Sequence, residues 1–237
     1  MDDNPSAQLA GIRLLSHLGA EALKPVAQSC MWRRYRRNEQ IVNRESESRD
    51  LFLVIKGSVE VANYSSTGRE IAFATIPSGE YFGELSAIDD LPRSATVSAA
   101  EDCSIAIMPR MIFLELLRND SRVATAVMRR LASIVRTCDD RIMDLSTLGA
   151  VQRVYVELLR ICGPDPAVTN MWSVYPMPTQ SDIAARASTT RETVARVLSQ
   201  LTQDGLIQRK GRTLYLNDRD RLRELAEHLD TGAGPAR

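Results

Sequence analysis

Between residues 39 and 108, short apolar runs alternate with turn-forming residues. The runs are rich in Val, Ile and Phe, which favour extended backbone. A series of short strands separated by turns is typical of an antiparallel barrel or sandwich. A helical stretch over 8–29 precedes them and is expected to pack on its outside. The predicted strands are IVN (41–43), LFLVIKG (51–57), SVEVANY (58–64), REIAFATI (69–76), ATVSA (95–99) and CSIAIM (103–108).

A long helix is predicted over residues 121–147, a stretch without glycine or proline. Its apolar positions follow a 4-3-4-3 spacing, which gives a narrow heptad seam rather than the wide apolar face of a globular helix. We therefore expect the helix to dimerise; the alternative is that it packs on its own barrel. The seam residues are Leu131, Val135, Cys138, Ile142 and Leu145.

After Gly149 the pattern becomes helical and ends in a basic hairpin. A helix (VQRVYVELLRIC), a Pro-rich loop (GPDPAVTNMWSVYPMP), two short helices (TQSDIAARA and TTRETVARVLSQLTQDG) and a hairpin (LIQRKGRTLYLND) follow one another. This order predicts a winged helix-turn-helix. The hairpin is expected to turn at Lys210-Gly211, and the tail DTGAGPAR is expected to be disordered.

The second short helix of this module has two distinct faces. At about 100° per residue, its apolar side chains gather on one face, while Arg191, Glu192 and Arg196 lie on the other. Arginine can pair bidentately with guanine and glutamate can accept from cytosine, so this face suits the major groove of DNA. The alternatives are a capping box between Thr189 and Glu192 and solvated arginines. Further candidate DNA contacts are Thr179, Gln180, Thr190, Arg209, Lys210 and Arg212.

Together these patterns predict an α+β chain: an N-terminal β-barrel of the jelly-roll type, a long dimerisation helix and a C-terminal winged helix-turn-helix. The expected boundaries are 1–120 for the sensor domain, 121–148 for the dimerisation helix and hinge, 149–225 for the DNA-binding domain and 226–237 for the tail. The hinge is expected around residues 146–150, where Gly149 permits a change of direction.

Composition narrows the classes of function. The 30 basic and 30 acidic residues cancel, so bulk charge indicates no partner. No apolar run approaches the roughly 18 residues of a membrane span, and the acidic start MDDNPSAQLA is unlike a signal peptide. We therefore expect a cytoplasmic protein without a membrane partner. Four scattered cysteines, and only His17 and His228, make a metal, haem or iron–sulfur site unexpected.

The segment FGELSAIDDLPRSA, residues 82–95, combines an acid, an arginine and hydroxyls with small residues. The small residues would let the backbone come close to a bound group. The alternative is a simple Glu84–Arg93 ion pair. No nucleophile–base pair, metal cluster or P-loop indicates an enzyme.

The order of these parts, with the motifs FGELSAIDDLPRSA and TTRETVARVL, resembles the cyclic-AMP receptor and fumarate–nitrate regulator family of bacterial transcription factors. The resemblance implies a homodimer that binds TGTGA-like pseudo-palindromes in double-stranded DNA, a cyclic nucleotide as allosteric ligand and contact with RNA polymerase. It implies that Arg191, Glu192 and Arg196 contact bases. In the sensor it implies a phosphate-binding cassette that includes Gly83, Glu84, Leu85, Ser86, Arg93, Ser94 and Ala95. In this cassette Arg93 would neutralise the single charge of a cyclic phosphodiester through a fork of donors, and Ser94 would add a hydroxyl. Glu84 would accept the proton of the ribose 2′-OH, and Gly83 would let the backbone approach the sugar.

The resemblance leaves the nucleotide open. Aligning the seams puts Cys138 and Asp139 where the cyclic-AMP receptors carry the Thr-Ser pair that contacts adenine, with Thr137 as a possible substitute. An ionised carboxylate only accepts, and guanine offers two adjacent donors, so Asp139 favours cyclic GMP beside or instead of cyclic AMP. The alternative is a solvated Asp139 that pairs with Arg136 or Arg141.

Three further functions stay open. One is a family member that binds DNA without a cyclic mononucleotide, a second is a sensor of cyclic di-GMP, and a third is a cyclic-nucleotide effector that acts through protein contacts.

Overall fold

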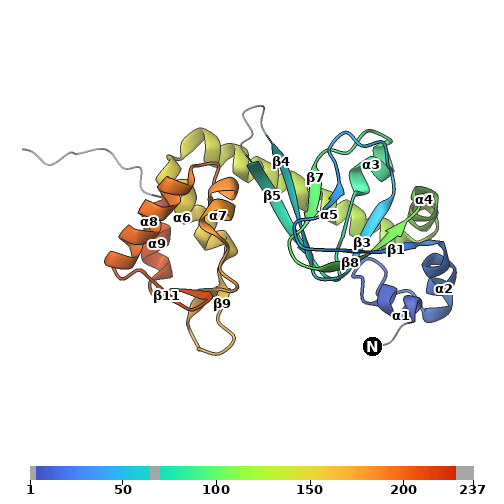
Figure 1. The fold of residues 1–237 in the computed structure, drawn as a ribbon, viewed down its shortest axis with the longest axis horizontal. Helices are drawn as coiled ribbons and strands as arrows, with labels where there is room; N and C mark the ends of the chain where they lie inside the picture. Colours follow the sequence, from blue (N-terminus) through green and yellow to red (C-terminus); the bar gives the residue numbers. More distant parts are fainter. Residues whose placement is uncertain (1–3, 65–69, 228–237) are drawn as a thin grey trace, which may run out of the picture. The chain divides into compact units, whose positions relative to one another are not determined.

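The computed structural model describes residues 4–64 and 70–227, and the chain forms two compact units, residues 1–136 and 137–237 (Figure 1). The predicted long helix is α5 (Ser121–Thr147), which contributes residues to both units. Its observed bounds match the sequence prediction, because nothing between them breaks a helix. Within the described residues, no helix is both long and apolar enough to cross a membrane.

Two four-stranded antiparallel sheets form the body of the N-terminal unit, with strand orders β1-β8-β3-β6 and β2-β7-β4-β5. The predicted jelly roll is confirmed, and its two sheets stay separate and do not close into a barrel. The strands are β1 (Met31–Tyr35), β2 (Gln40–Val42), β3 (Leu51–Lys56), β4 (Ser58–Tyr64), β5 (Glu70–Pro77), β6 (Tyr81–Phe82), β7 (Thr96–Ala99) and β8 (Cys103–Met108).

The six predicted strand runs are confirmed, whereas β1 and β6 were missed. The sequence of β1, MWRRY, carries two arginines, and the strand pairs only with β8, at the edge of its sheet. Strand β6 has only two residues. An edge strand can be highly polar and a two-residue strand has no periodicity, so neither leaves a pattern in the sequence.

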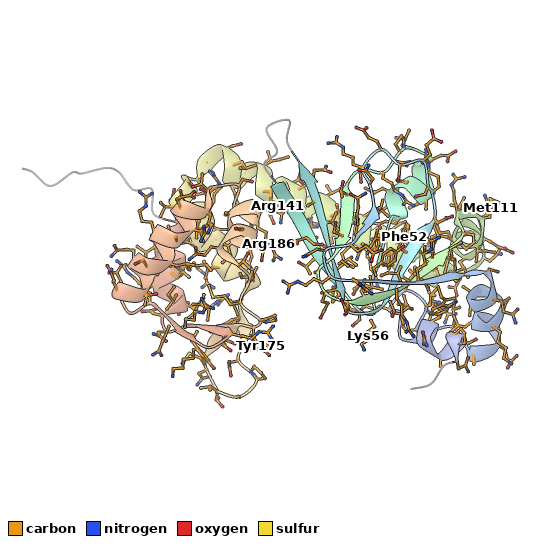
Figure 2. All side chains as sticks on the ribbon, viewed as in Figure 1. Phe52, Lys56, Met111, Arg141, Tyr175 and Arg186 are labelled. Carbon is orange, nitrogen blue, oxygen red and sulfur yellow. The ribbon has the colours of Figure 1, made fainter. Side chains whose placement is uncertain are left out.

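Strand β3 is apolar on both faces because both faces are covered. Leu51 and Leu53 join a core with the surrounding helices, while Phe52 and Val54 join the core between the two sheets. The ring of Phe52 stacks on Phe82 at 4.8 Å between centroids, in the interior of the unit (Figure 2). Burial on both sides explains the continuous run LFLVI.

Helices cover one face of the first sheet. The predicted helical stretch over 8–29 is two helices, α1 (Pro5–Ala10) and α2 (Ala20–Ser29), separated by turns. They pack with α4 (Arg110–Asn119) and the first turns of α5 against the sheet, around the fully buried Phe113. Met111, on the same helix as Phe113, points to the surface (Figure 2).

The C-terminal unit contains the predicted helices around a small sheet. The helices are α6 (Ala150–Ile161), α7 (Gln180–Arg186), α8 (Arg191–Gln203) and α9 (Arg219–Glu227). The sheet has the order β11-β12-β10-β9, with β9 (Gly163–Pro164), β10 (Trp172–Val174), β11 (Ile207–Lys210) and β12 (Thr213–Leu216). Val194, Val197, Leu198 and Leu201 of α8 are buried in its core, as the helical periodicity predicts.

Three details of this unit differ from the predictions. The Pro-rich loop contributes β9 and β10, and α9 was not predicted at all. Since Lys210 pairs with Thr213, the two turn residues are Gly211 and Arg212 rather than Lys210-Gly211. The tail predicted to be disordered, 230–237, lies outside the described residues.

A break between α5 and α6 falls at Leu148 and Gly149, inside the predicted hinge segment. Gly149 caps α6 with φ −67° and ψ 163°, an extended conformation that any residue adopts. Its backbone N–H donates to Gln152 Oε1 at 3.0 Å. The break therefore does not depend on the conformational freedom of glycine, which corrects that part of the sequence prediction.

Candidate functional site: a buried arginine in the sensor and an exposed helix face in the DNA-binding unit

The segment 82–95 forms a short helix and a loop that returns to the second sheet. Strand β6 ends at Phe82, Gly83 follows with φ +88°, and α3 (Glu84–Asp89) begins directly after it. A Cβ at position 83 would lie 2.5 Å from Arg93 Nη1 and 3.1 Å from the carbonyl oxygen of Asp50. Both the backbone angle and the lack of space require glycine at this position.

Arg93 is buried, with 4 % of its surface exposed, and its guanidinium is held by oxygen atoms of the chain. Nη1 donates to Gly83 O at 3.0 Å and Nη2 to Asp50 O at 2.7 Å. Nε and Nη2 both donate to Ser48 Oγ, at 3.2 and 3.1 Å. The guanidinium also lies 5.1 Å from the centre of the Phe52 ring.

None of these partners of Arg93 is a carboxylate. Burial lowers the pKa of Arg93, the charges of Asp50 and Glu84 raise it, and the charge of Arg49 lowers it. An arginine nevertheless stays protonated at neutral pH. Arg93 is thus a buried positive charge whose hydrogen-bond acceptors are all neutral, and such a charge favours an anion.

Glu84 is also buried, at 5 % exposure, but it does not form the ion pair with Arg93 that the sequence offered as an alternative. The carboxylate oxygen Oε1 of Glu84 lies 3.6 Å from Nε of Arg130, on α5. Arg130 also donates to Tyr81 O at 2.8 Å and lies 3.4 Å from a carboxylate oxygen of Glu80. These contacts connect the start of α3 to the long helix.

Arg130 is one of the residues of this site that sequence reasoning missed, together with Ser48 and Asp50. Its guanidinium packs 4.6 Å from the centre of the Tyr81 ring. The only signal in the sequence was an arginine directly before Leu131, the first residue of the predicted seam. Leu131 itself packs against the core of the N-terminal unit, so this turn of α5 faces the sensor.

The other predicted cassette residues lie in the same segment with different exposures. Ser86 is buried and its hydroxyl donates to Pro92 O at 3.3 Å. Leu85 and Ser94 are exposed, and Ala95 is half-buried. The backbone carbonyl of Ser94 accepts from the side-chain amide of Asn63 at 3.1 Å. The structure therefore brings Gly83, Glu84 and Arg93 together and leaves Ser94 at the surface.

The three residues predicted to contact the base belong to a different element, α5. Thr137, Cys138 and Asp139 are all exposed on α5, within the second compact unit.

Cys138 is a free thiol, as are the buried Cys30 and Cys103 and the half-buried Cys162.

The seam of α5 is largely exposed. Val135 is 58 % exposed, Ile142 60 % and Leu145 51 %. Met128, seven residues before Val135, is 61 % exposed and extends the heptad spacing toward the start of the helix. Leu131 differs, because it packs against the sensor core.

Helix α8 presents its polar face to solvent. Arg191, Glu192 and Arg196 are exposed. The capping box suggested as an alternative is wrong, because the cap residue is Thr190, whose hydroxyl accepts from the Thr193 N–H at 3.2 Å. The pKa of Glu192 is lowered by a hydrogen bond from its own backbone N–H, by one with the Thr190 hydroxyl and by the charge of Arg191. Glu192 is therefore an ionised acceptor at the start of α8.

The remaining candidate DNA contacts lie on α7 and on the hairpin. Thr179 caps α7, where its hydroxyl accepts from Asp182 N and Asp182 accepts from Thr179 N, and Gln180 is the first helical residue. Lys210 and Arg212 are exposed near the aromatic rings of Tyr215 and Tyr175, at 5.7 and 5.9 Å. Arg209 donates to Gly211 O at 3.2 Å.

Side chains suited to a metal do not gather in any part of the chain that the structure describes. His17 contacts the carboxylate of Asp120 at 2.9 Å, and His228 lies outside the described residues.

Comparison with known proteins identifies both parts of the chain. Residues 32–120 match the family described as "Cyclic nucleotide-binding domain", and residues 152–225 match "Crp-like helix-turn-helix domain". The chain is 31% identical to the cAMP-activated global transcriptional regulator Vfr of Pseudomonas aeruginosa over 191 residues, which is 79% of this chain and 89% of Vfr. It is 32% identical to the cyclic AMP receptor protein of Thermus thermophilus over 180 residues, 74% of this chain and 79% of that protein.

Solved structures agree with these matches. FixK2 of Bradyrhizobium japonicum superposes with a TM-score of 0.69 at 27% identity, covering 83% of this chain and 96% of FixK2. A CooA mutant of Carboxydothermus hydrogenoformans, at 21% identity, shares the fold with a TM-score of 0.77, covering 96% of this chain and 97% of that one. The chain has a cyclic nucleotide-binding domain and a DNA-binding helix-turn-helix, and it belongs to the cyclic-AMP receptor and fumarate–nitrate regulator family, whose members are transcription regulators and not enzymes.

Proposed function

We propose that this chain is a homodimeric transcription regulator whose sequence-specific DNA binding is switched by a cyclic mononucleotide. The observation on which the proposal rests is Arg93, a buried cation without a carboxylate acceptor. A cyclic phosphodiester has one negative charge and geometry that suits a guanidinium fork. We propose that Gly83, Glu84, Leu85, Ser86, Arg93, Ser94 and Ala95 form the nucleotide site.

Glu84 has a role that a phosphate site alone would not explain. A buried carboxylate near an anion costs free energy unless it has donors. Arg130 supplies one cation at 3.6 Å from its oxygen, and the 2′-OH of a ribose would supply a further donor. This combination favours a ligand with both a phosphate and a ribose over a free anion.

The identity of the base rests on residues 137–139 of α5. We propose cyclic AMP, cyclic GMP or both as ligands. An ionised Asp139 would accept from the two adjacent donors of guanine, whereas adenine offers only its amino group. In the single chain Asp139 is exposed, and this exposure also fits the alternative that Asp139 is a solvated surface charge.

The dimer is proposed from the exposed seam. Val135, Ile142 and Leu145 expose more than half of their surface each, and burying such side chains stabilises association by about 25 cal/mol per Å². A second copy of α5 with the same heptad spacing is the occupant that fits. A two-fold dimer would set two α8 helices about one turn of DNA apart, roughly 34 Å, on a TGTGA-like pseudo-palindrome.

On the DNA side, we propose base contacts from Arg191, Glu192 and Arg196. The supporting observation is that all three are exposed at the start of α8 while its apolar face is buried. Thr179, Gln180, Thr190 and Lys210 are proposed to position the unit on the phosphates, which confers no sequence preference. The resemblance to the family extends the proposal to RNA polymerase as a partner and to a cytoplasmic location.

One observation favours a competing function, a family member that binds DNA without a nucleotide. Four hydrogen bonds already occupy the guanidinium of Arg93 inside the chain. In such a protein Arg93 would simply hold Gly83, Asp50 and Ser48 together. Responses to ligand, rather than DNA binding itself, separate the two functions.

The test is a calorimetric titration of the purified protein with cyclic AMP and, separately, cyclic GMP, followed by DNA binding with and without the ligand. Heat from either nucleotide and tighter binding to a TGTGA palindrome than to a scrambled duplex are expected. Because linkage is reciprocal, the DNA must tighten nucleotide binding by the same factor. Heat from neither nucleotide, with unchanged DNA affinity, would refute the switch. DNA binding without sequence preference would favour an effector that acts through protein contacts.

The same titration of Asp139→Ser tests the base assignment. The variant is expected to shift the ratio of affinities toward cyclic AMP. An unchanged ratio would remove Asp139 from the site and leave the rest of the proposal intact.

A further inference from the structure

Ser48 is a residue that neither the motifs nor the family resemblance singled out. It lies in the loop between β2 and β3 and is exposed, whereas Arg93 is buried. Its hydroxyl oxygen accepts from two nitrogens of Arg93 at once, Nε at 3.2 Å and Nη2 at 3.1 Å. The hydroxyl therefore occupies the edge of the guanidinium that Nε and Nη2 form.

A guanidinium has two edges on which an anion can bind with two parallel hydrogen bonds. The edge formed by Nη1 and Nη2 faces the carbonyl oxygens of Gly83 and Asp50, at 3.0 and 2.7 Å. The edge formed by Nε and Nη2 faces Ser48. An anion that takes a bidentate position on Arg93 must therefore displace either two backbone carbonyls or one serine hydroxyl.

The two edges differ in how easily they can be vacated. Gly83 is fixed between β6 and α3, and Asp50 directly precedes β3, so their carbonyls move only if these elements move. The loop of Ser48 is also tied down, since Arg93 N donates to Ser46 O at 3.3 Å and Glu45 N donates to Arg93 O at 3.1 Å. The Ser48 hydroxyl, however, can leave by rotation about a single side-chain bond.

We propose that the Ser48 hydroxyl is an internal competitor of the ligand phosphate for the Nε–Nη2 edge of Arg93, and so lowers the affinity for the cyclic nucleotide. This inference rests on the proposed function. Its physical basis is that Ser48 stabilises only the nucleotide-free state. A hydrogen bond that is broken on binding subtracts from the binding free energy.

We therefore expect Ser48→Ala to bind the cyclic nucleotide more tightly than the unaltered protein does. Such a gain is unusual for a substitution beside a ligand site. Removing the hydroxyl exposes the Nε–Nη2 edge to water, and the phosphate then displaces water instead of a serine. One charge-assisted hydrogen bond corresponds to an increase in affinity of roughly tenfold or more. Ser48→Thr keeps the hydroxyl and is expected to bind within about twofold of the unaltered protein.

The experiment is a calorimetric titration of the full chain, Ser48→Ala, Ser48→Thr and Ser29→Ala with cyclic AMP and with cyclic GMP. Ser29 is the matched control, an exposed serine on α2 whose hydroxyl donates to Pro25 O at 2.9 Å. A second measurement compares the Tm of each protein without nucleotide and at saturation. In Ser48→Ala we expect a lower Tm only without nucleotide, by a few degrees.

Tighter binding by Ser48→Ala, with Ser48→Thr and Ser29→Ala unchanged, supports the competitor. Equal or weaker binding by Ser48→Ala overturns it, because Ser48 would then be neutral, would position Arg93 or would contact the ligand. Loss of affinity in Ser48→Ala together with a lower Tm at saturation would identify the positioning role. If the unaltered chain binds neither nucleotide, the proposed function fails first and the competitor fails with it.

Discussion

The two charged sites of this chain are constructed in opposite ways. In the sensor unit, Arg93 and Glu84 are 4 % and 5 % exposed, and the protein itself supplies their hydrogen-bond and ion-pair partners. In the DNA-binding unit, Arg191, Glu192 and Arg196 are exposed to solvent. The difference follows from the cost of burying charge, which must be offset by partners in the fold, whereas exposed charge is stabilised by water.

This contrast has consequences for substitutions. A change at a buried charge alters both folding and binding, because the partners in the fold lose their contacts as well. A change at an exposed charge on α8 alters DNA binding alone, since surface substitutions usually change stability by less than about 0.5 kcal/mol. The following experiments test that separation, from the largest expected effect to the smallest.

Arg93→Ala is expected to reduce cyclic-nucleotide affinity at least roughly a hundredfold, because it removes a bidentate charge-assisted contact of about 3 kcal/mol. It also leaves the carbonyls of Gly83 and Asp50 without their donor, so the Tm should fall. Calorimetry and thermal unfolding measure the two effects. Arg33→Ala, an exposed arginine on β1 of the same unit, is the control and should change neither. Undiminished nucleotide binding by Arg93→Ala would remove the basis of the proposed site.

Gly83→Ala is expected to lower the free energy of unfolding by about 2–3 kcal/mol, because an L side chain at positive φ is strained and its Cβ would collide with Arg93. Gly211→Ala is a matched control, since Gly211 has φ +59° but no atom within 4 Å of the added Cβ. The difference between the two variants in denaturant unfolding therefore measures the collision. Equal losses would mean that the Arg93 guanidinium moves aside at no cost.

Arg191→Ala is expected to weaken binding to a TGTGA-like site by about 1–3 kcal/mol while binding to unrelated DNA changes little. Its Tm should stay that of the unaltered protein because the side chain is exposed. Lys210→Ala should instead weaken binding to all sequences alike and reduce the salt dependence. Titrations of both duplexes at two salt concentrations distinguish these outcomes. A uniform loss in Arg191→Ala would make it a phosphate contact.

The smallest expected effect concerns a buried acid in the described part of the DNA-binding unit, Glu157. Glu157 on α6 is 4 % exposed, and burial raises its pKa, although the nearby Arg186, Arg141 and Arg160 lower it and Asp144 raises it. Figure 2 labels Arg141 and Arg186 on α5 and α7. The pKa of Glu157 is higher in the folded state than in the unfolded state, so the folded state binds more protons. The contribution of Glu157 to the free energy of unfolding therefore falls as the pH rises from the ordinary pKa of glutamate through the folded pKa.

Glu157→Gln should therefore flatten the pH dependence of unfolding in that window, with the smallest effect of the series. Glu192→Gln is the control at an exposed acid, whose pKa is lowered rather than raised. Unfolding curves between about pH 4 and 8 measure both. A slope unchanged in Glu157→Gln would mean that the three arginines fully compensate the buried charge.

Much of the architecture followed from patterns within single segments. The bounds of α5, the buried face of α8 and six strands were predicted because apolar periodicity within a segment fixes which residues are buried. The missed elements include β1, β6, α4, β9, β10 and α9, most of which are short or rich in charge. Their existence depends on a partner segment, such as β8 for β1, and a segment without a pattern of its own does not indicate its partner.

The amino-acid sequence by itself determined which residues of the sensor bear charge and which glycine lies beside them, since the motif 82–95 contains Gly83, Glu84 and Arg93 within a single segment. Only the tertiary structure decided how these charges are paired. Glu84 faces Arg130 from α5, and Arg93 is enclosed by Ser48, Asp50 and Gly83 rather than by Glu84. The physical reason is that pairing of buried charges is set by which segments pack together, and packing brings together residues 45 positions apart, such as Ser48 and Arg93.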